Sequence, residues 1–182
     1  MKYIIAGRVG SGKTTLAKRM EMRGLRIAKS FTTRPRRPGE DDDYLFISQE
    51  EADKYPPSER VVATSRQEYE YFMSRDEVLR SDIFVVDPNG VRDLAKEFPN
   101  EQFVLIYVRP ASVELAQRFH DNRDPGGKSF AERSAAEDKL FTAFEQNLMR
   151  KDFRTMFAGC YNILNNYNGG LTAWAKRFTE ED

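Results

Sequence analysis

The sequence has few of the residue types on which disulfides, zinc sites and nucleophilic catalysis depend. Its 182 residues include a single cysteine, Cys160, and a single histidine, His120. One cysteine cannot form an internal disulfide, and one cysteine with one histidine cannot supply the four ligands of a structural zinc site. We therefore expect neither feature. Because no second ligand or nucleophile accompanies it in the sequence, His120 is expected to be a solvated surface residue.

Long hydrophobic runs and an excess of charge of one sign are also absent. No segment approaches the roughly 18 apolar residues that a membrane span requires, and residues 1–6 are too short an apolar stretch for a signal peptide. The 29 basic and 29 acidic side chains balance, which argues against a strongly basic nucleic-acid-binding protein. The sequence therefore predicts a soluble, cytoplasmic protein with no nucleic-acid or membrane partner, in which any anion-binding site is local.

What the sequence does contain is a regular alternation of short apolar runs with helical stretches. This alternation is typical of an α/β domain built on a parallel sheet, and 182 residues suit one domain of this kind. Strands are expected at residues 3–6, 25–28, 83–87, 103–108 and 160–164. Helices are expected to begin near Lys13, Asn89, Ser112, Phe130 and Leu171.

Finer patterns concern individual helices. Ser48 and Ser74 each precede a glutamate by three residues, which is the spacing of a capping box, and predict two short helices. A long helix with one apolar face is predicted by the spacing of Phe141, Phe144, Leu148 and Phe153.

One motif has a direct chemical meaning. Residues 7–14 read G-R-V-G-S-G-K-T, which fits G-x-x-x-x-G-K-[ST], and the motif lies between an apolar strand and a helical stretch. The glycines let the backbone curl so that its N–H groups point at phosphate oxygens, and the N-terminus of the helix adds partial positive charge. Lys13 is expected to reach the β- and γ-phosphates of ATP, and Thr14 is the expected Mg²⁺ ligand. The expected ATP-binding residues in this segment are Gly7, Arg8, Val9, Gly10, Ser11, Gly12, Lys13, Thr14 and Thr15.

A second segment concentrates positive charge. Arg34, Arg36 and Arg37 lie within four positions, and Pro35 and Pro38 stiffen the backbone around them. Rigidly spaced guanidinium groups suit a bidentate grip on phosphate. Taken alone, such a charge cluster is more typical of a solvated loop. The phosphate-binding motif upstream reverses that preference, although both interpretations stay open for Arg36.

The two segments together resemble guanylate kinase and its nucleoside monophosphate kinase relatives. The similarity continues from the phosphate-binding loop through residues 30–46, which read S-x-T-T-R-x-x-R-x-G-E and then D-Y-x-F. Residues 87–91, D-P-N-G-V, are similar to the family's D-x-Q-G-V, and further matches are Arg118, Arg123, Arg133 and Asn165. The resemblance covers nearly the whole chain, and S-x-T-T-R is much more specific than the loop, which many NTPases share.

The resemblance implies a three-layer α/β P-loop NTPase fold with a parallel sheet of about five strands. Residues 1–182 then form a single P-loop kinase domain. Its implied parts are a core of residues 1–29, 82–120 and 134–182, an inserted region at 30–81 that binds the nucleoside monophosphate, and a lid at 121–133. ATP and a nucleoside monophosphate are the implied substrates, GMP or dGMP above others, with Mg²⁺ as cofactor and in-line transfer of the γ-phosphoryl group.

The same resemblance implies roles for individual residues. The monophosphate would contact Ser30, Arg34, Arg37, Tyr44, Tyr71 and Asp87, with Ser30 and Asp87 near its base. Asn165 would lie near the adenine of ATP. The residues expected to act in catalysis are Lys13, Arg34, Arg37, Arg118, Arg123 and Arg133. Phosphoryl transfer depends on positioned anions and neutralised charge, so the scarcity of histidine and cysteine is no obstacle.

The chain departs from the family where the base would be recognised. Val62 stands where the family has a glutamate that accepts hydrogen bonds from guanine, and Met73 stands in place of a serine or threonine. Glu68 or Glu70 could substitute for that glutamate, and Val85 replaces the first acid of the family's D-x-D. A pocket for another base or a modified nucleotide is equally compatible with these residues.

Two further alternatives remain. One is a kinase of the same fold for a different phosphate acceptor, such as a phosphorylated sugar. The other is a catalytically inactive guanylate-kinase-like binding module, against which the intact Gly12-Lys13-Thr14 and the lid arginines argue. Arg8 and Val9 replace the family's usual Pro-Ser, and this is expected to matter little because these positions contribute mainly backbone.

Overall fold

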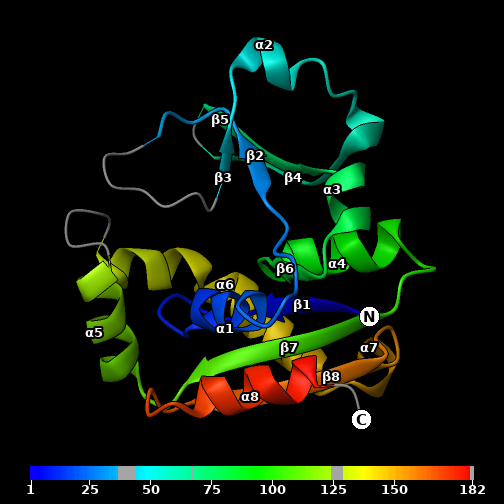
Figure 1. The fold of residues 1–182 in the computed structure, drawn as a ribbon. Coiled ribbons are helices and arrows are strands. Elements are labelled where there is room, and N and C mark those ends of the chain that lie inside the picture. The colour runs from blue at the N-terminus through cyan, green and yellow to red at the C-terminus, as the bar shows by residue number, and fades with distance from the viewer. Residues whose placement is uncertain (37–43, 67, 124–128, 181–182) are drawn as a thin grey trace.

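A parallel sheet of four strands forms the centre of the molecule (Figure 1). The computed structural model describes residues 1–36, 44–66, 68–123 and 129–180. Every neighbouring pair of strands in this sheet is parallel, and the predicted α/β class is confirmed. The order across the sheet is β6 (Ile83–Val85), β1 (Lys2–Ala6), β7 (Phe103–Pro110) and β8 (Gly159–Asn165).

The expected fifth strand of this sheet is not formed. Residues 25–28 contribute one isolated parallel bridge, between Ile27 and Ile83, at the β6 edge. Gly24, at φ +99°, turns the chain just before this segment, and from Ser30 onward the chain already belongs to another sheet. The Arg26 carbonyl and the Ala28 N–H hydrogen-bond the start of β6, but the segment forms a single bridge and no ladder.

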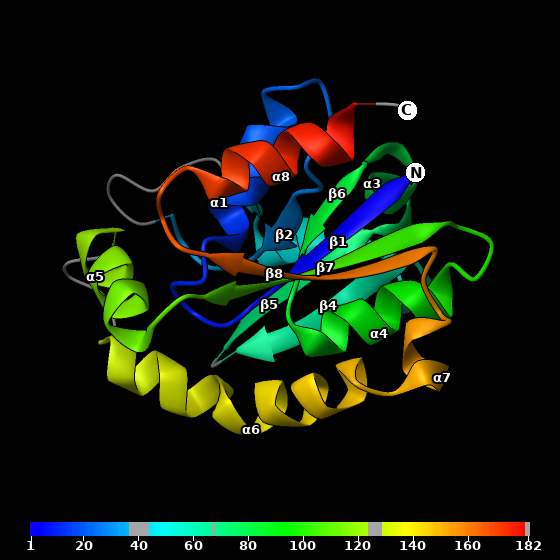
Figure 2. The same cartoon turned by 90° about the horizontal axis from the view of Figure 1, so that it is seen from below.

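Helices cover both faces of the parallel sheet (Figure 2). Successive strand residues point to opposite faces, so Ile5 packs in one apolar cluster and Ile4 in the other. Phe141, Phe144 and Leu148 are buried in the cluster of Ile4 and lie on one long helix, as predicted. Phe153 packs against the same cluster, but the expectation that it shares that helix is wrong, because the long helix ends at Leu148 and Phe153 lies on the separate short helix Lys151–Arg154. The covering helices are α1 (Lys13–Glu21) and α8 (Gly170–Thr179) on one face and α4 (Pro88–Glu97), α6 (Phe130–Leu148) and α7 (Lys151–Arg154) on the other.

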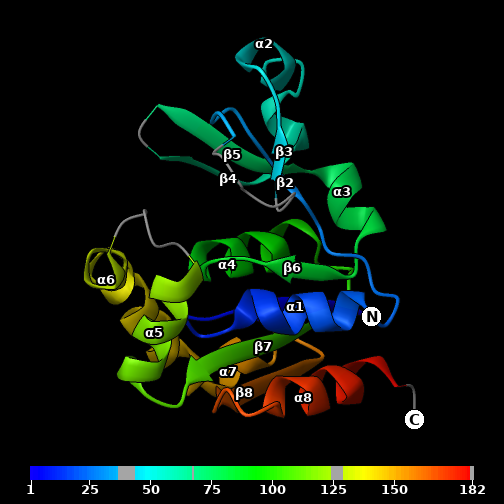
Figure 3. The ribbon, with the colours of Figure 1, turned by 60° about the vertical axis from the view of Figure 1, so that its left-hand side comes forward.

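A second, mixed sheet stands apart from the first and is built from residues 30–74 (Figure 3). Its strand order is β3 (Tyr44–Phe46), β2 (Ser30–Thr32), β5 (Tyr69–Ser74) and β4 (Arg60–Arg66). Val61 and Met73 of this sheet are buried in the cluster that contains Val91 of α4, so the two sheets share a core. Three short elements complete this part: α2 (Gln49–Ala52), the 3-10 turn η1 (Pro57–Glu59) and α3 (Arg75–Arg80).

The helices begin within one residue of each expected position, and α5 spans Val113–Arg123. The capping box at Ser48 is complete, because its hydroxyl accepts the Glu51 N–H and its own N–H donates to the Glu51 carboxylate. A further box, Ser129 with Glu132, begins α6 and was not anticipated, although its spacing is the same. Within the described residues no helix is long and apolar enough to cross a membrane.

The second expected box is only half formed. The Ser74 hydroxyl accepts the Glu77 N–H at 3.1 Å, as the pattern predicts. The Glu77 carboxylate instead accepts the Lys29 N–H at 3.0 Å. This side chain therefore joins α3 to the segment between the two sheets.

His120 is buried, and the expectation of a solvated residue is wrong. Its side chain is 5% exposed, its ring lies 5.8 Å from that of Phe130, and its Nδ1 is 3.1 Å from Asp121 Oδ1. The sequence around it is polar, but α5 turns this residue toward the start of α6. The burial is thus a consequence of helix packing that no local pattern reports.

Candidate nucleotide-binding site

The glycine-rich loop follows β1 and leads into α1. Gly10, at φ +72°, and Gly12, at φ +93°, occupy the left-handed region, which residues with a side chain rarely adopt. A β-carbon on Gly10 would lie 2.4 Å from the Ala116 carbonyl oxygen of α5, and one on Gly12 would lie 2.5 Å from the Asn165 amide nitrogen. Both conformation and crowding therefore require glycine at these two positions.

The segment after β8 supports this loop. Asn165 Nδ2 donates a 3.0 Å hydrogen bond to the Ser11 carbonyl, and the Tyr167 hydroxyl donates to the Gly10 carbonyl. The Tyr167 N–H in turn donates to Asn165 Oδ1 at 2.9 Å. Asn165 is only 3% exposed, so in this structure its amide holds the loop backbone in place.

Lys13 is the first residue of α1 and lies over the same loop. Its Nζ donates to the Arg8 carbonyl at 3.3 Å, and that carbonyl also accepts the Ser11 N–H at 3.1 Å. Thr14 and Thr15 follow in the first turn and are partly exposed. The loop thus places one cation and two hydroxyl groups at the N-terminus of a helix, where anions are favoured.

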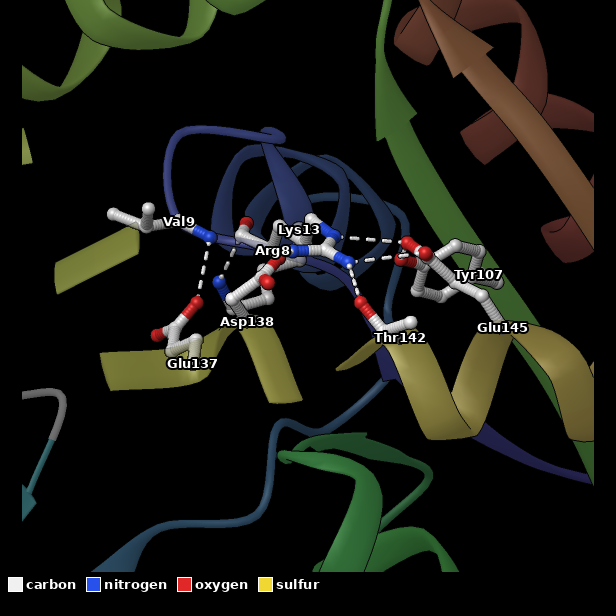
Figure 4. Close-up of polar contacts among 8 residues, drawn as sticks. All are labelled: Arg8, Val9, Lys13, Tyr107, Glu137, Asp138, Thr142 and Glu145. Atoms are coloured by element: carbon white, nitrogen blue, oxygen red, sulfur yellow. Dashed lines mark hydrogen bonds and ion pairs between the residues drawn. The ribbon is translucent and has the colours of Figure 1, made fainter. Parts of the chain in front are cut away.

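Arg8 is tied through its side chain to helix α6, so the expectation that it contributes mainly backbone is wrong. Its guanidinium donates to the Glu145 carboxylate from Nε at 2.9 Å and from Nη2 at 3.0 Å. It also donates to Asp138 at 2.8 Å and to the Thr142 hydroxyl at 3.1 Å. Figure 4 shows these contacts, which reach three side chains on successive turns of α6.

Two neighbours complete this ion-pair network. The Tyr107 hydroxyl of β7 donates to Glu145, and burial together with this bond raises the pKa of Tyr107 above its usual range. The hydrogen bond from Arg8 holds the pKa of Glu145 below its ordinary value. Glu145 is therefore a carboxylate near neutral pH, and the pair with Arg8 is ionic.

Helix α6 also contacts the backbone of the loop. The Glu137 carboxylate accepts the Val9 N–H at 3.0 Å (Figure 4). Val9 thus contributes a backbone donor, as expected, but in this structure the donor is engaged by a side chain of the protein. No pattern around Val9 or Arg8 predicted these contacts. The spacing of Glu137, Asp138, Thr142 and Glu145 beside the apolar face of α6 is the one signal that could have suggested them.

A second cluster of expected site residues lies on the mixed sheet. The Tyr44 and Tyr71 rings are 5.9 Å apart in an edge-on arrangement. The Arg34 guanidinium lies 5.9 Å from the Tyr44 ring and 5.4 Å from the Phe46 ring, and Ser30 pairs with Tyr44 between β2 and β3. The structure therefore brings Arg34, Tyr44, Tyr71 and Ser30 together. Arg37 lies outside the described residues.

The positions expected to recognise a base are apolar. Val62 lies at an irregularity of β4, between Val61 and Thr64, with φ +54°. Its Cγ1 would be 2.8 Å from a β-carbon on Gly90, so its side chain is directed at the first turn of α4. Met73 is 2% exposed in the shared core. Neither residue offers a polar atom to a base.

The nearby carboxylates have other partners. Glu70 pairs with Arg60 at 2.6 Å and, by strand alternation, faces away from the Tyr71 side of β5, so it does not replace the missing glutamate. Glu68 hydrogen-bonds the Tyr69 hydroxyl and raises the pKa of that phenol. Asp87 is the N-cap of α4 and accepts N–H groups of residues 89 and 90, each at 3.0 Å.

The remaining arginines lie on the two helices next to the loop. Arg118 is exposed on α5, and Arg133 is partly exposed in the first turn of α6, one turn before Glu137. Arg123 ends α5, and its side chain lies outside the described part of the chain, as do residues 124–128 of the expected lid. The structure thus directs α5 and α6 toward the loop from one side.

This arrangement defines a class of protein. The first strand of a parallel sheet leads through a glycine-rich loop into a helix, and a separate cluster of arginine and tyrosine lies on an inserted sheet. These two features are typical of a P-loop phosphotransferase. Comparison with known proteins identifies the family: the family model "Guanylate kinase" matches residues 1–165, and the chain belongs to the guanylate kinase family.

Known relatives agree with this assignment. The chain is 32% identical over 182 residues to a guanylate kinase of Rhodopseudomonas palustris, covering 90% of this chain and 81% of that protein. It is 27% identical over 177 residues to a guanylate kinase of Hydrogenovibrio crunogenus, covering 88% and 85%. A solved guanylate kinase of Anaplasma phagocytophilum, 19% identical, shares the fold with a TM-score of 0.61 over 98% of this chain and 82% of that one. The protein is an ATP-dependent phosphotransferase, a nucleoside monophosphate kinase of guanylate kinase type.

Proposed function

We propose that this kinase transfers the γ-phosphoryl group of Mg·ATP to a nucleoside monophosphate held by the mixed sheet, with GMP or dGMP as the favoured acceptor. One observation carries the proposal. The phosphate-binding loop with Lys13 lies on the core, and a separate group of Arg34, Tyr44 and Tyr71 lies on the second sheet. Transfer between two nucleotides requires two such anion sites, one for each.

In the proposed complex, residues 7–15 hold the ATP phosphates. Backbone N–H groups of the loop point at the phosphate oxygens, Lys13 stays with the transferred group, and Asn165 supports the loop on the adenine side. The Thr14 hydroxyl fits as a Mg²⁺ ligand, since Mg²⁺ takes one or two protein oxygens and otherwise uses phosphate and water. When bound, the ion neutralises charge on the phosphates. The Asp87 carboxylate is engaged by backbone N–H groups, and the side chain of Val85 has no oxygen to offer.

The acceptor would be held within residues 30–81. Arg34 and Arg37 bind its phosphate, the hydroxyl groups of Tyr44 and Tyr71 donate hydrogen bonds to the same phosphate, and Ser30 and Asp87 lie near its base. Guanidinium groups suit this task because their planar N–H pairs match phosphate oxygens. The relatives named guanylate kinase support guanine as the base.

The charge that develops on the transferred group would be neutralised by Arg118, Arg123 and Arg133. Arg123 and Arg133 lie in the segment 121–133, which we propose as the lid, and Arg118 lies just before it. Closure over the nucleotides excludes water, which would otherwise hydrolyse ATP. The core of the kinase is then 1–29, 82–120 and 134–182.

The proposal is tested by measuring ADP formation from Mg·ATP with GMP, dGMP, AMP, CMP, UMP, dTMP and no acceptor. We expect turnover with GMP or dGMP well above the rate without acceptor, and loss of that turnover in Lys13→Met. Turnover with another base alone would overturn the assignment of guanine. ATP binding without turnover on any acceptor of the panel would favour a kinase for another phosphate acceptor or a binding module.

A further inference from the structure

Arg8 contacts helix α6 through its side chain and Lys13 of the loop through its backbone carbonyl. Its guanidinium makes a two-point ion pair with Glu145 and further bonds to Asp138 and Thr142. Its carbonyl accepts the Lys13 ammonium at 3.3 Å. One residue therefore links the lysine of the loop to the helix that faces it.

Helix α6 carries a second group of the proposed site. Arg133 lies one turn before Glu137 on α6, and residues four apart share a helix face. Glu137 contacts the Val9 N–H at 3.0 Å, so this face of the helix is turned toward the loop (Figure 4). Any shift of α6 relative to the loop therefore moves Arg133 relative to Lys13.

The ion pair between Arg8 and Glu145, called the anchor below, opposes such a shift. Arg8 is 24% exposed and Glu145 35% exposed, the Tyr107 hydroxyl of β7 holds Glu145 from the other side, and the Arg8 guanidinium lies 5.8 Å from the Phe141 ring. A bidentate arginine–carboxylate pair fixes orientation as well as distance. The loop, α6 and β7 are thereby locked to one another at a single residue.

We propose that Arg8 is a positioning residue that sets the separation of Lys13 and Arg133 on either side of the transferred phosphoryl group. The inference rests on the proposed function, because it concerns the geometry of that transfer. Loss of the guanidinium removes no backbone N–H group of the loop, so ATP still binds, but the loop is held less firmly and the two cations no longer align with the transition state. The effect therefore falls on kcat and not on the KM for ATP.

The test compares Arg8→Met and Arg8→Lys with the wild-type kinase in steady-state kinetics. Misplacement of a catalytic group by about 1 Å costs roughly 100-fold, and we expect kcat to fall by about this factor in Arg8→Met while the KM for ATP changes less than about threefold. Arg8→Lys keeps one ionic contact and recovers part of the loss. The matched control is Arg150→Met, which removes a two-point pair with Asp152 on the surface and leaves kcat unchanged.

A second comparison separates positioning from general stability. Glu145→Gln breaks the same anchor from the other end, so the double variant Arg8→Met/Glu145→Gln is expected to be no slower than Arg8→Met alone. If the double variant instead lost kcat by the product of the two single-variant losses, the two residues would act independently and the proposal would be overturned. A kcat of Arg8→Met within about twofold of the wild type would overturn it as well. If Arg8→Met does not fold, Arg8→Lys and Glu145→Gln carry the same test.

The anchor can also be tested without turnover. Amide hydrogen exchange of residues 7–14 is expected to be faster in Arg8→Met than in the wild type, with exchange in α8 unchanged. An unaltered loop would overturn the inference even if the wild type is an active kinase. Absence of kinase activity in the wild type would overturn the proposed function, and the exchange measurement would still decide whether Arg8 holds the loop.

Discussion

The carboxylate of Glu137 accepts the backbone N–H of Val9 at 3.0 Å, so an anionic group of helix α6 occupies a donor of the phosphate-binding loop. Asp138 and Glu145 lie close by and share Arg8 as their counter-ion. The loop must accept the polyphosphate of ATP beside these carboxylates. Like charges brought together in this way oppose binding, so we expect Glu137 to lower the affinity for ATP.

Removing the charge of Glu137 is therefore expected to strengthen ATP binding. Glu137→Gln keeps an oxygen that can accept the Val9 N–H but carries no charge. We expect the Kd for Mg·ATP to decrease by about three- to tenfold, with the larger effect at low ionic strength because salt screens the repulsion. Equilibrium titration at two salt concentrations measures both effects.

Asp152→Asn is the matched control for this experiment. Asp152 is exposed on α7 and pairs with Arg150, so its replacement changes the net charge of the protein equally but not the charge beside the loop. A Kd for Glu137→Gln that is unchanged, or that rises, would show that the carboxylate does not compete with the nucleotide.

The acceptor side offers a comparison between two neighbouring arginines. Arg34 lies near the rings of Tyr44 and Phe46, and Arg36 lies over the Phe46 ring at 4.8 Å. Arg34→Ala is expected to lower kcat/KM for the monophosphate by about 100-fold, the value of a charged hydrogen-bonded contact. Arg36→Ala is expected to change it by less than about threefold. Equal losses in the two variants, measured by varying the monophosphate at saturating ATP, would contradict a specific role for Arg34.

A further prediction concerns acid stability. Glu77 is 1% exposed and accepts hydrogen bonds from the Lys29 N–H at 3.0 Å and from Arg80 Nε at 2.8 Å. Burial acts to raise its pKa, but these two donors outweigh burial and hold the pKa of Glu77 below its ordinary value of 4.5. A carboxyl whose pKa is depressed by folding stabilises the protein above its unfolded-state pKa, and that contribution is lost as the pH falls through the folded-state value.

Glu77→Gln is thus expected to lower the free energy of unfolding by about 2 kcal/mol at pH 7. The difference from the wild type should shrink as the pH falls below 4.5, because the carboxyl takes up a proton first in the unfolded state and, at lower pH, in the folded state as well. Urea unfolding across this pH range measures it. Asp76→Asn is the control, since Asp76 also pairs with Arg80 but is 78% exposed, and its replacement should have little effect at any pH. A gap that stays constant with pH would contradict the linkage.

Features set by short stretches of sequence could be predicted. The phosphate-binding loop needs particular glycines within eight positions, and the starts of the longer helices follow from local periodicity. The short helix α7 begins without a side-chain cap and was not predicted. The segment 25–28 looked like a strand because its composition is that of one. Strand formation, however, depends on pairing with β6, which here is limited to one bridge before the chain enters the mixed sheet at Ser30.

Features that depend on residues distant in sequence could not be predicted. The contacts of Arg8 join residue 8 to residues 138–145, and the burial of His120 depends on the position of α6. An inserted region at residues 30–81 was expected, but its arrangement as a mixed sheet of β2, β3, β4 and β5 was not, because the pairing of β2 with β5 joins residues about 40 positions apart. Each of these features depends on packing between elements, for which a single sequence carries no signal comparable to a motif.

The last prediction concerns the base. Guanine presents N1–H and N2–H₂ donors, for which a carboxylate is the natural acceptor. Val62 occupies the position at which the family has its glutamate, and its side chain points at Gly90 in the first turn of α4. Met73 beside it is buried and apolar, and Glu70 is paired with Arg60. The described residues of β4 and β5 therefore offer a guanine no carboxylate that corresponds to the glutamate of the family.

Val62→Glu is expected to raise the preference for GMP over AMP by about 10- to 100-fold in kcat/KM, the range given by hydrogen bonds to a charged group. The backbone favours the change, because a β-branched residue is strained at φ +54° and glutamate is not β-branched. Val62→Gln has the same size without the charge and should gain much less. If Val62→Glu and Val62→Gln leave the preference for GMP equal to that of the wild type, the base lies elsewhere, and recognition must then come from Asp87, Ser30 or Glu68 on the other elements around the acceptor.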